Sequence, residues 1–214
     1  MHITILWWSG RMWQILIRQV LSHHRTVTAL VRRRWSLDAL LSSSDGLLHE
    51  IIWDATDPND IQQAIRDSDA IIHVVSVPLF HRQPTHLYSH TTKAVIDAVW
   101  DKKIPYIVMS NTGTHHIRQH MPRGIRHLYT YFLWDVADNK EYEEQLLEDS
   151  TLQWTIIKSP FLTPGWIQKT TVRLFELYKS WTLDMISRNT VASVIIDTII
   201  HHKYIRQKIV PIAI

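Results

Sequence analysis

The chain has 214 residues, of which 45% are hydrophobic, and it carries a formal net charge of +3 with its 14 histidines counted as neutral. This apolar share allows a sizeable core and argues against wholesale disorder. No apolar run approaches the ~20 residues that span a bilayer, and the lack of cysteine excludes disulfides and thiolate chemistry. One domain covering residues 1–214 is the simplest expectation.

The start of the chain and its charge pattern bear on location and partners. The first residues are strand-like and lack the basic-then-apolar pattern of a signal peptide, which together with the lack of cysteine favours the cytoplasm. Basic residues are scattered apart from the run Arg32-Arg33-Arg34, and no basic stripe with interleaved aromatic residues is found. We therefore expect a small-molecule substrate, neither nucleic acid nor membrane as a partner, and a monomer or homodimer.

Apolar strand-like runs alternate with helical patterns along the whole chain. The predicted strands are, in chain order, 2–6, 26–31, 47–53, 70–75, 106–109, 154–157 and 208–212. The predicted helices are 11–22, 57–66, 88–101, 139–148 and 187–201, with a polar turn at 110–113 and a loop at 115–124. This alternation is typical of βαβ units. We expect a single α/β, Rossmann-like, doubly wound domain with a mostly parallel sheet flanked by helices.

The turn between the first strand and the first helix has an unusual composition. Trp7, Trp8 and Trp13 surround a single glycine, Gly10, in a chain with ten tryptophans and five glycines. A dinucleotide-binding turn uses three glycines, which permit the bend, the approach of backbone to pyrophosphate, and close packing of helix on strand. This segment has the strand–turn–helix layout of such a turn but lacks two of its three glycines.

Several motifs in order resemble the atypical short-chain dehydrogenase/reductase family, specifically its NmrA-like and biliverdin-IXβ (flavin) reductase-like NAD(P)H-binding group. After the first strand comes Ser-Gly-Arg, followed by TALVR ending at Arg32, WDATDP at 53–58 and IVMSN at 107–111. The segment 138–163, DNKEYEEQLLEDSTLQWTIIKSPFLT, is the longest and most specific match. The resemblance covers essentially the entire chain.

The resemblance implies an NADP cofactor, or NAD. The pairs His86/His90 and His116/His120 have i, i+4 spacing but no HExxH pattern, so we expect no metal site. Arg32 matches the residue that would meet a 2′-phosphate, which favours NADP. The implied cofactor-binding residues are Ser9, Gly10, Arg11, Met12, Arg32, Asp54, Ala55, Val75, Ser76, Lys140 and Pro160. Plainer interpretations exist for several of them: Arg32 as a solvated end of a strand, Asp54 as a helix cap and Ser76 as a turn residue.

The chain departs from the family pattern at the glycine positions. Trp7 and Trp13 stand at the flanking glycines of the turn, and Trp53 stands where relatives have glycine beside the adenine. Because overpacking by even a methylene costs about 1–3 kcal/mol, the rings must find new space. We hypothesise that they enter the dinucleotide cleft and obstruct it.

Candidate catalytic residues follow the fifth predicted strand. Ser110 and Asn111 stand where reductases of this fold orient substrate and nicotinamide, although a plain polar turn is an alternative. The usual Tyr-x-x-x-Lys pair is missing, because Val136 lies four residues before Lys140. The resemblance then favours an NAD(P)H-dependent reductase of a flat conjugated acceptor such as a flavin or quinone. The alternative is a non-catalytic Rossmann-like protein, either a dinucleotide-sensing regulator or a scaffold with an obstructed pocket.

Overall fold

One large sheet forms the centre of the molecule. The computed structural model describes residues 1–7, 11–31, 37, 42, 44–52, 57–76, 86–99, 102–112, 123–178 and 184–214, with backbone alone for residues 125, 126 and 128–135. The large sheet has eight strands in the order β3-β2-β1-β4-β5-β6-β10-β8. Every neighbouring pair is parallel except β10 with β8. The strands are β1 (His2–Leu6), β2 (Thr26–Val31), β3 (Leu48–Ile52), β4 (Ala70–His73), β5 (Pro105–Asn111), β6 (Gln153–Ser159), β8 (Thr170–Leu174) and β10 (Gln207–Ala213).

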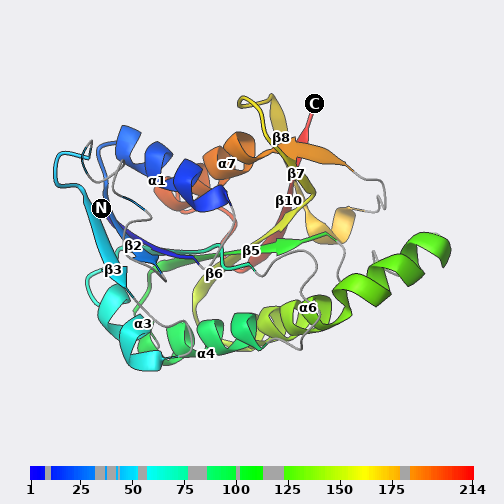
Figure 1. The fold of residues 1–214 in the computed structure, drawn as a ribbon, viewed down its shortest axis with the longest axis horizontal. Helices are drawn as coiled ribbons and strands as arrows, with labels where there is room; N and C mark the ends of the chain where they lie inside the picture. Colours follow the sequence, from blue (N-terminus) through cyan, green and yellow to red (C-terminus); the bar gives the residue numbers. More distant parts are fainter. Residues whose placement is uncertain are drawn as a thin grey trace.

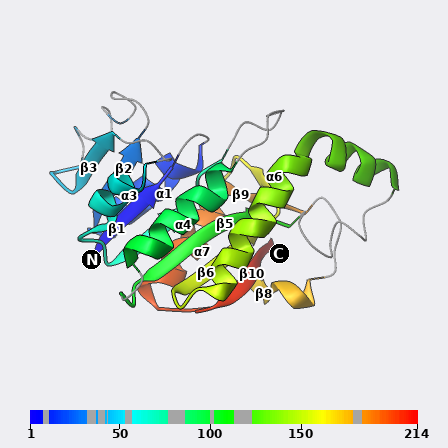
Figure 2. The same ribbon diagram turned by 90° about the horizontal axis from the view of Figure 1, so that it is seen from below.

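Helices cover both faces of this sheet, as a doubly wound fold requires (Figure 1). The helices are α1 (Met12–Ser22), α3 (Pro58–Ile65), α4 (Leu87–Val99), α6 (Arg123–Asp149) and α7 (Arg188–Ile200), with a short 3-10 turn η1 (Phe175–Leu177). The first and last helices pack together on one face, and the other three lie side by side across the opposite face (Figure 2). A separate two-stranded parallel sheet pairs β7 (Phe161–Thr163) with β9 (Met185–Ser187).

Two hydrophobic cores fill the space between the sheet and its helices. The strand β1 supplies both, because alternate side chains point to opposite faces. Ile3 and Ile5 pack toward α1 and α7, whereas Leu6 packs toward α3 and α4. Both faces of the central strands are therefore buried, which explains the nearly unbroken apolar sequence of β4.

Local capping sets where two of the helices begin. The Asp57 side chain accepts a hydrogen bond of 2.8 Å from the backbone N–H of Asn59, and Pro58 occupies the first helical position of α3. Ser187 caps α7 by accepting from the Thr190 N–H at 3.1 Å. These signals are readable in sequence, and both helices begin where they were predicted within a residue or two.

The sequence-based elements differ from the structure mainly in the second half of the chain. The helix α6 begins at Arg123, not at 139, so residues 123 and 124 of the predicted loop are helical, whereas 115–120 lie outside the described residues. The strand β5 extends through Asn111 because it pairs with β6 over its full length, which places Ser110 and Asn111 in the strand and not in a turn. The short strands β7, β8 and β9 were not predicted, because three to five residues carry too little periodicity.

None of the helices in the described part of the chain combines the length and the apolar character that crossing a membrane requires.

A pair of stacked indoles lies where β1 meets α1, in the core between the sheet and the helices α1 and α7. Trp7 and Trp13 have ring centroids 3.7 Å apart and planes inclined by 16°. Only 7% of Trp7 and 5% of Trp13 is exposed, and both rings pack within the core cluster that contains Ile3, Ile5 and Leu16. The two rings together fill the space between the end of β1 and the start of α1.

We expect the Trp7–Trp13 stack to appear as a coupling energy in a double-mutant cycle. Trp7→Leu and Trp13→Leu should each lower the free energy of unfolding by about 2 kcal/mol, and the double variant should lose about 1 kcal/mol less than their sum. Urea unfolding measures all three. The control pairs Trp13→Leu with Trp154→Leu, a buried tryptophan of the other core, whose effects should add. Additivity in the first cycle would contradict the stacked arrangement.

Candidate functional site

The carboxyl ends of the central parallel strands define the candidate site. The chain proceeds from β1 to β2 and β3 on one side and then returns to β4, β5 and β6 on the other, so the order reverses between β1 and β4. In open α/β sheets the ligand crevice lies outside the carboxyl ends of the strands at this reversal. The segments that follow β1, β4, β5 and β6 are therefore the ones to consider.

The N-terminus of α1 adjoins this reversal. Arg11 is its N-cap residue, with φ −112° and ψ −8°, and its side chain makes no capping hydrogen bond. The first turn contains no acidic residue, Arg11 is exposed and Met12 is buried. The N–H groups of the first turn and the positive end of the helix dipole favour an anion at this end of α1. Ser9, Gly10, Arg32, Asp54 and Ala55, which belong to the predicted cofactor site, lie outside the described residues.

Two of the three rings proposed to enter the cleft, those of Trp7 and Trp13, belong instead to the core beneath the turn. Trp7 follows the alternation of Ile3 and Ile5 toward α1, and Trp13 lies on the buried side of α1. Trp8 and Trp53 are outside the described residues.

The predicted residues after β4, β5 and β6 are brought to the same edge of the sheet. Val75 is buried and Ser76 half-buried, just beyond β4, where the ladder with β1 continues through a 3.0 Å hydrogen bond from the Val74 N–H to the Leu6 carbonyl. Asn111 is half-buried at the end of β5, opposite Ser159, and the buried Pro160 follows β6. The structure therefore gathers Ser76, Asn111 and Pro160 at this edge, as predicted.

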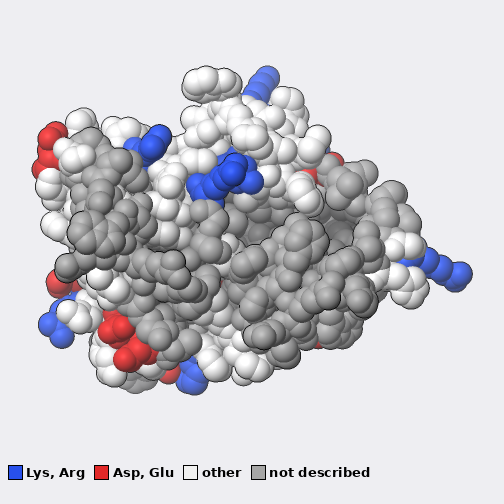
Figure 3. Space-filling view, in the orientation of Figure 1, with Lys and Arg blue, Asp and Glu red and all other residues white. Residues whose placement is uncertain are grey.

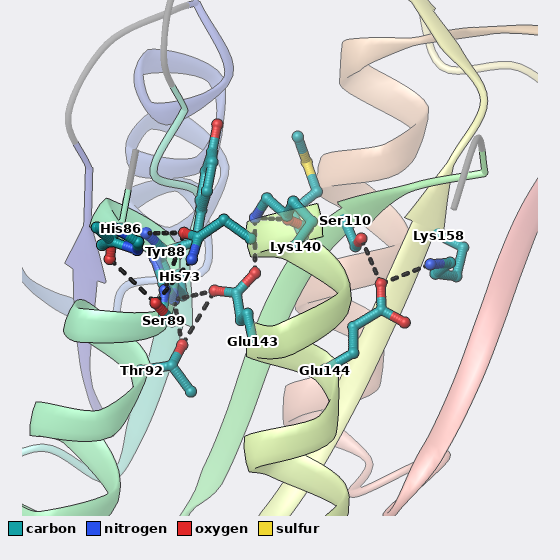
Figure 4. A network of polar contacts seen from close by, with 12 residues as sticks. His73, His86, Tyr88, Ser89, Thr92, Ser110, Lys140, Glu143, Glu144 and Lys158 are labelled. Carbon is teal, nitrogen blue, oxygen red and sulfur yellow. Dashed lines mark hydrogen bonds and ion pairs between the residues drawn. The ribbon is translucent and has the colours of Figure 1, made fainter. Parts of the chain in front are cut away.

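Ser110 has a different environment from the one its predicted role requires. Its hydroxyl is 4% exposed and donates a 2.6 Å hydrogen bond to Oε1 of Glu144 on α6 (Figure 4). The hydroxyl thus points toward α6, and its proton already takes part in this hydrogen bond. Proton donation to a substrate would first require this bond to break.

Lys140 is likewise bound on several sides. Its ammonium donates to the Met109 carbonyl at 2.9 Å and to Oε2 of Glu143 at 2.8 Å. It also lies 4.0 Å from the centroid of the Tyr88 ring, a cation–π distance (Figure 4). The lysine therefore connects the carboxyl end of β5 to α6 and α4, directly below the candidate site.

Glu143 extends this contact into a fully buried polar cluster. Its Oε1 accepts a 3.0 Å hydrogen bond from the Thr92 hydroxyl and lies 3.2 Å from Nδ1 of His73. The same Nδ1 lies 2.8 Å from the Tyr106 hydroxyl, which is 3.1 Å from that of Thr92. Every polar atom on this side of the ring has a partner, which a buried network needs to be stable.

Burial dominates the titration of this cluster. It raises the pKa of Glu143, with the Lys140 ammonium opposing the rise. Burial, aided by Lys140, lowers the pKa of His73 well below its usual value, and burial with the Glu143 carboxylate raises the pKa of Tyr106 well above its own. The histidine is therefore neutral at physiological pH, and the tyrosine stays protonated.

Glu144 forms a second buried cluster on the adjacent side of α6. Its Oε1 accepts from the Lys158 ammonium at 2.5 Å, and its Oε2 lies 3.0 Å from Nζ of Lys208. Burial by itself would raise the pKa of Glu144, but the two lysines and the hydrogen bonds from Lys158 and Ser110 outweigh it and set the pKa at about 2. Burial lowers the pKa of Lys158, with Glu144 opposing.

Sequence analysis missed both clusters. The segment EYEEQLLED predicts a charged amphipathic helix, in which adjacent glutamates usually face water. Here Glu143 and Glu144 are both fully buried, because Glu143 pairs with Lys140 three residues earlier in the same helix and Glu144 pairs with Lys158 of β6. One signal was available: Lys158 interrupts the apolar strand sequence TIIKS, and a lysine inside a buried strand requires an acidic partner.

The Glu144 cluster predicts a defined pH dependence of stability. The folded pKa of about 2 lies below the ordinary value of 4.5, so this carboxylate stabilises the fold above pH 4.5, and the contribution is lost as the pH falls toward 2. Each pKa unit corresponds to about 1.4 kcal/mol. Glu144→Gln should therefore lower the free energy of unfolding by about 3 kcal/mol at pH 7, and the difference from wild type should shrink between pH 4.5 and pH 3.

Urea unfolding across this pH range measures the effect. Asp97→Asn serves as the control, because Asp97 forms an exposed ion pair with Lys93 and should contribute less than about 1 kcal/mol at any pH. A pH-independent loss in Glu144→Gln would show that the carboxylate charge is not what matters.

Comparisons with known proteins agree with this geometry. Comparison with curated protein sequences found no match. Among solved structures, the anaerobilin reductase ChuY from Escherichia coli O157:H7 is 15% identical with a TM-score of 0.76, over 100% of this chain and 97% of that one. The oxidoreductase ylbE from Lactococcus lactis is 17% identical with a TM-score of 0.76, over 100% and 91%.

A third similar structure contains a cofactor. The short-chain dehydrogenase/reductase from Veillonella parvula, in complex with NADP, is 16% identical with a TM-score of 0.75, over 99% of this chain and 94% of that one. At these identities the likeness establishes the Rossmann-like fold. A sequence profile described as NAD(P)H-binding matches residues 9–202, which is most of the chain. This match covers more than half of the chain, so with its parallel sheet and the reversal of strand order between β1 and β4 the chain belongs to the NAD(P)H-binding family.

Proposed function

We propose that the protein is an NADPH-dependent reductase that transfers hydride to a flat, conjugated acceptor such as a flavin or a quinone. The balanced reaction takes hydride from NADPH and one proton from water, and yields NADP⁺ and the two-electron-reduced acceptor. The observation that carries the proposal is the exposed Arg11 at the N-terminus of α1, which follows β1 and so adjoins the point where the strand order reverses. That arrangement suits a pyrophosphate.

The choice of NADP over NAD rests on sequence and on likeness. Arg32, at the end of the second strand sequence, is the residue type and position that would meet a 2′-phosphate. A similar short-chain dehydrogenase/reductase was solved with NADP. Guanidinium groups pair with phosphate through two parallel hydrogen bonds, which makes arginine suited to this discrimination.

The class of acceptor is inferred from the polar groups that already form hydrogen bonds within the protein. A carbonyl substrate needs a proton donor at the oxygen that becomes an alcohol, but the Ser110 hydroxyl is bound to Glu144 and the Lys140 ammonium to Met109 and Glu143. Val136 stands where a tyrosine donor would be. A flavin or quinone delocalises the charge that hydride adds and can take its proton from water. NADPH supplies the hydride, and the protein supplies position.

The same engaged groups support a second candidate, a protein that binds the dinucleotide without turnover. A regulator of this kind would use the α1 N-terminus for recognition and have no acceptor. A scaffold with an obstructed cleft is the third reading, for which Trp7 and Trp13 offer little support because both rings lie in the core. Recovery of binding in Trp7→Gly, with none in the wild type, would favour obstruction.

We expect NADPH to bind the wild-type protein saturably and Arg11→Ala to weaken it about tenfold, since one charge-assisted contact to phosphate is removed. Isothermal titration calorimetry measures both. Arg18→Ala is the matched control, an exposed arginine of the same helix two turns further on, and its affinity should equal that of wild type. Equal loss in both variants would indicate a diffuse charge effect, and no binding by wild type would refute the proposal.

Turnover separates the reductase from the regulator. NADPH oxidation, followed by its absorbance with flavin and quinone acceptors, should occur in the wild type and persist in Ser110→Ala within about threefold, although that variant loses about 1 kcal/mol of stability with its hydrogen bond. A loss of a hundredfold or more would show instead that Ser110 donates the proton. Binding without oxidation of NADPH would favour the regulator.

A further inference from the structure

One loop presents a tryptophan almost entirely to solvent. Trp166, between β7 and β8, is 91% exposed, and the adjacent Ile167 is 63% exposed. Ile214 is 71% exposed, and its N–H donates a 2.9 Å hydrogen bond to the carbonyl of Lys169, two residues after Ile167. We call Trp166, Ile167 and Ile214 the apolar shelf. Tryptophan is normally a highly buried residue, so this exposure needs a reason.

The loop that carries the shelf is firmly attached to the first turn of α7. The Trp166 carbonyl accepts a 2.7 Å hydrogen bond from the Ser187 hydroxyl, and the Gly165 carbonyl accepts one of 2.6 Å from the Asn189 amide. The Gln168 N–H donates to the Thr190 hydroxyl at 2.8 Å. The main chain is thus fixed, and the indole is held outward by a supported backbone.

Basic residues predominate in the segments around the shelf. The segment 161–175, which contains the loop, and the stretches 11–22 and 187–196 contain five lysines and arginines and no aspartate or glutamate, while Glu176, Asp184 and Asp197 lie just outside them. These residues are Arg11, Arg18, Lys169, Arg173 and Arg188. The segregation is marked, since the whole chain has 23 basic and 20 acidic residues. Figure 3 shows basic side chains over the half of the molecule that carries α1 and α7, and its largest acidic group in the other half.

Three of these cations adjoin the contacts that hold the loop. Lys169 directly follows the loop, and its carbonyl binds Ile214. Arg188 precedes Asn189, which binds Gly165, and Arg18 precedes Gln19, whose amide donates to the Asn189 carbonyl at 3.1 Å. The exposed indole and isoleucine therefore belong to a face whose elements carry several basic residues.

We infer that this face docks on an anionic lipid surface, with Trp166 and Ile167 entering the interface and Lys169, Arg18 and Arg188 facing the headgroups. Indoles favour the boundary between headgroups and acyl chains, and each cation near an anionic bilayer adds attraction. A second copy of the chain suits this face less well, because a symmetric contact would place the basic segments against each other. The inference departs from the expectation of no membrane partner, which rested on the absence of a spanning segment; peripheral docking needs none.

Vesicle sedimentation tests the inference without depending on the proposed reductase activity. The wild-type protein should sediment with vesicles of phosphatidylcholine and phosphatidylglycerol, and much less with phosphatidylcholine alone. Raising the salt to about 1 M, where the Debye length is about 3 Å, should release it. Trp166→Ser should weaken the partitioning about tenfold, the loss expected for one large apolar side chain, and Lys169→Glu should weaken it for anionic vesicles.

The control is Tyr142→Ser, which removes an exposed aromatic residue from α6 on the opposite face and should leave partitioning unchanged. Because Trp166 is so exposed, its replacement should not impair folding, and the urea midpoint checks this. Failure of the wild type to bind anionic vesicles, or equal binding by Trp166→Ser, overturns the inference. So does a dimer in light scattering that Trp166→Ser dissociates, because the shelf would then be an interface between copies.

Discussion

The attachment of α6 to the sheet depends on two adjacent buried carboxylates. Glu143 and Glu144 point to different sides of the helix. Glu143 meets Lys140 of the same helix, the Thr92 hydroxyl of α4 and His73 of β4. Glu144 meets Lys158 of β6, Lys208 of β10 and the Ser110 hydroxyl of β5. Removing one partner of such a pair leaves a charge unpaired in the interior, which costs several kcal/mol. The helix therefore has one position in which all of these groups are satisfied. That position sets where Lys140 and Ser110 lie below the candidate site.

This constraint also limits the chemistry. The groups that a short-chain dehydrogenase would use for proton transfer are, in this chain, part of the structure that holds α6 in place. Acid–base catalysis asks for a group that can exchange its proton at the working pH, whereas the Glu144 carboxyl, with a pKa of about 2, stays ionised. Among the described residues, the carboxyl edge retains Ser76, Asn111 and Pro160. These residues suit the binding and orientation that the proposed hydride transfer between two conjugated ring systems needs.

The tryptophans serve different purposes according to where the fold places them. Trp7 and Trp13 stack in the core that faces α1 and α7, and Trp154 packs in the core that faces α3, α4 and α6. Trp166 lies on the surface, held outward by a loop whose carbonyls are bound to α7. Identical side chains thus contribute core volume in one place and an exposed apolar surface in another. Composition alone, ten tryptophans in 214 residues, cannot separate the two uses.

The sequence alone predicts the order of most strands and helices, the parallel doubly wound architecture and the position of the turn between β1 and α1. These depend on local periodicity, caps and βα alternation, which neighbouring residues encode. Only the tertiary structure decided that α6 begins at Arg123, that Ser110 faces Glu144, and that Glu143 and Glu144 are buried. The reason is physical: a carboxylate is stable in the interior only beside partners such as Lys158 and Lys208, and those partners come from distant strands that meet it only after folding.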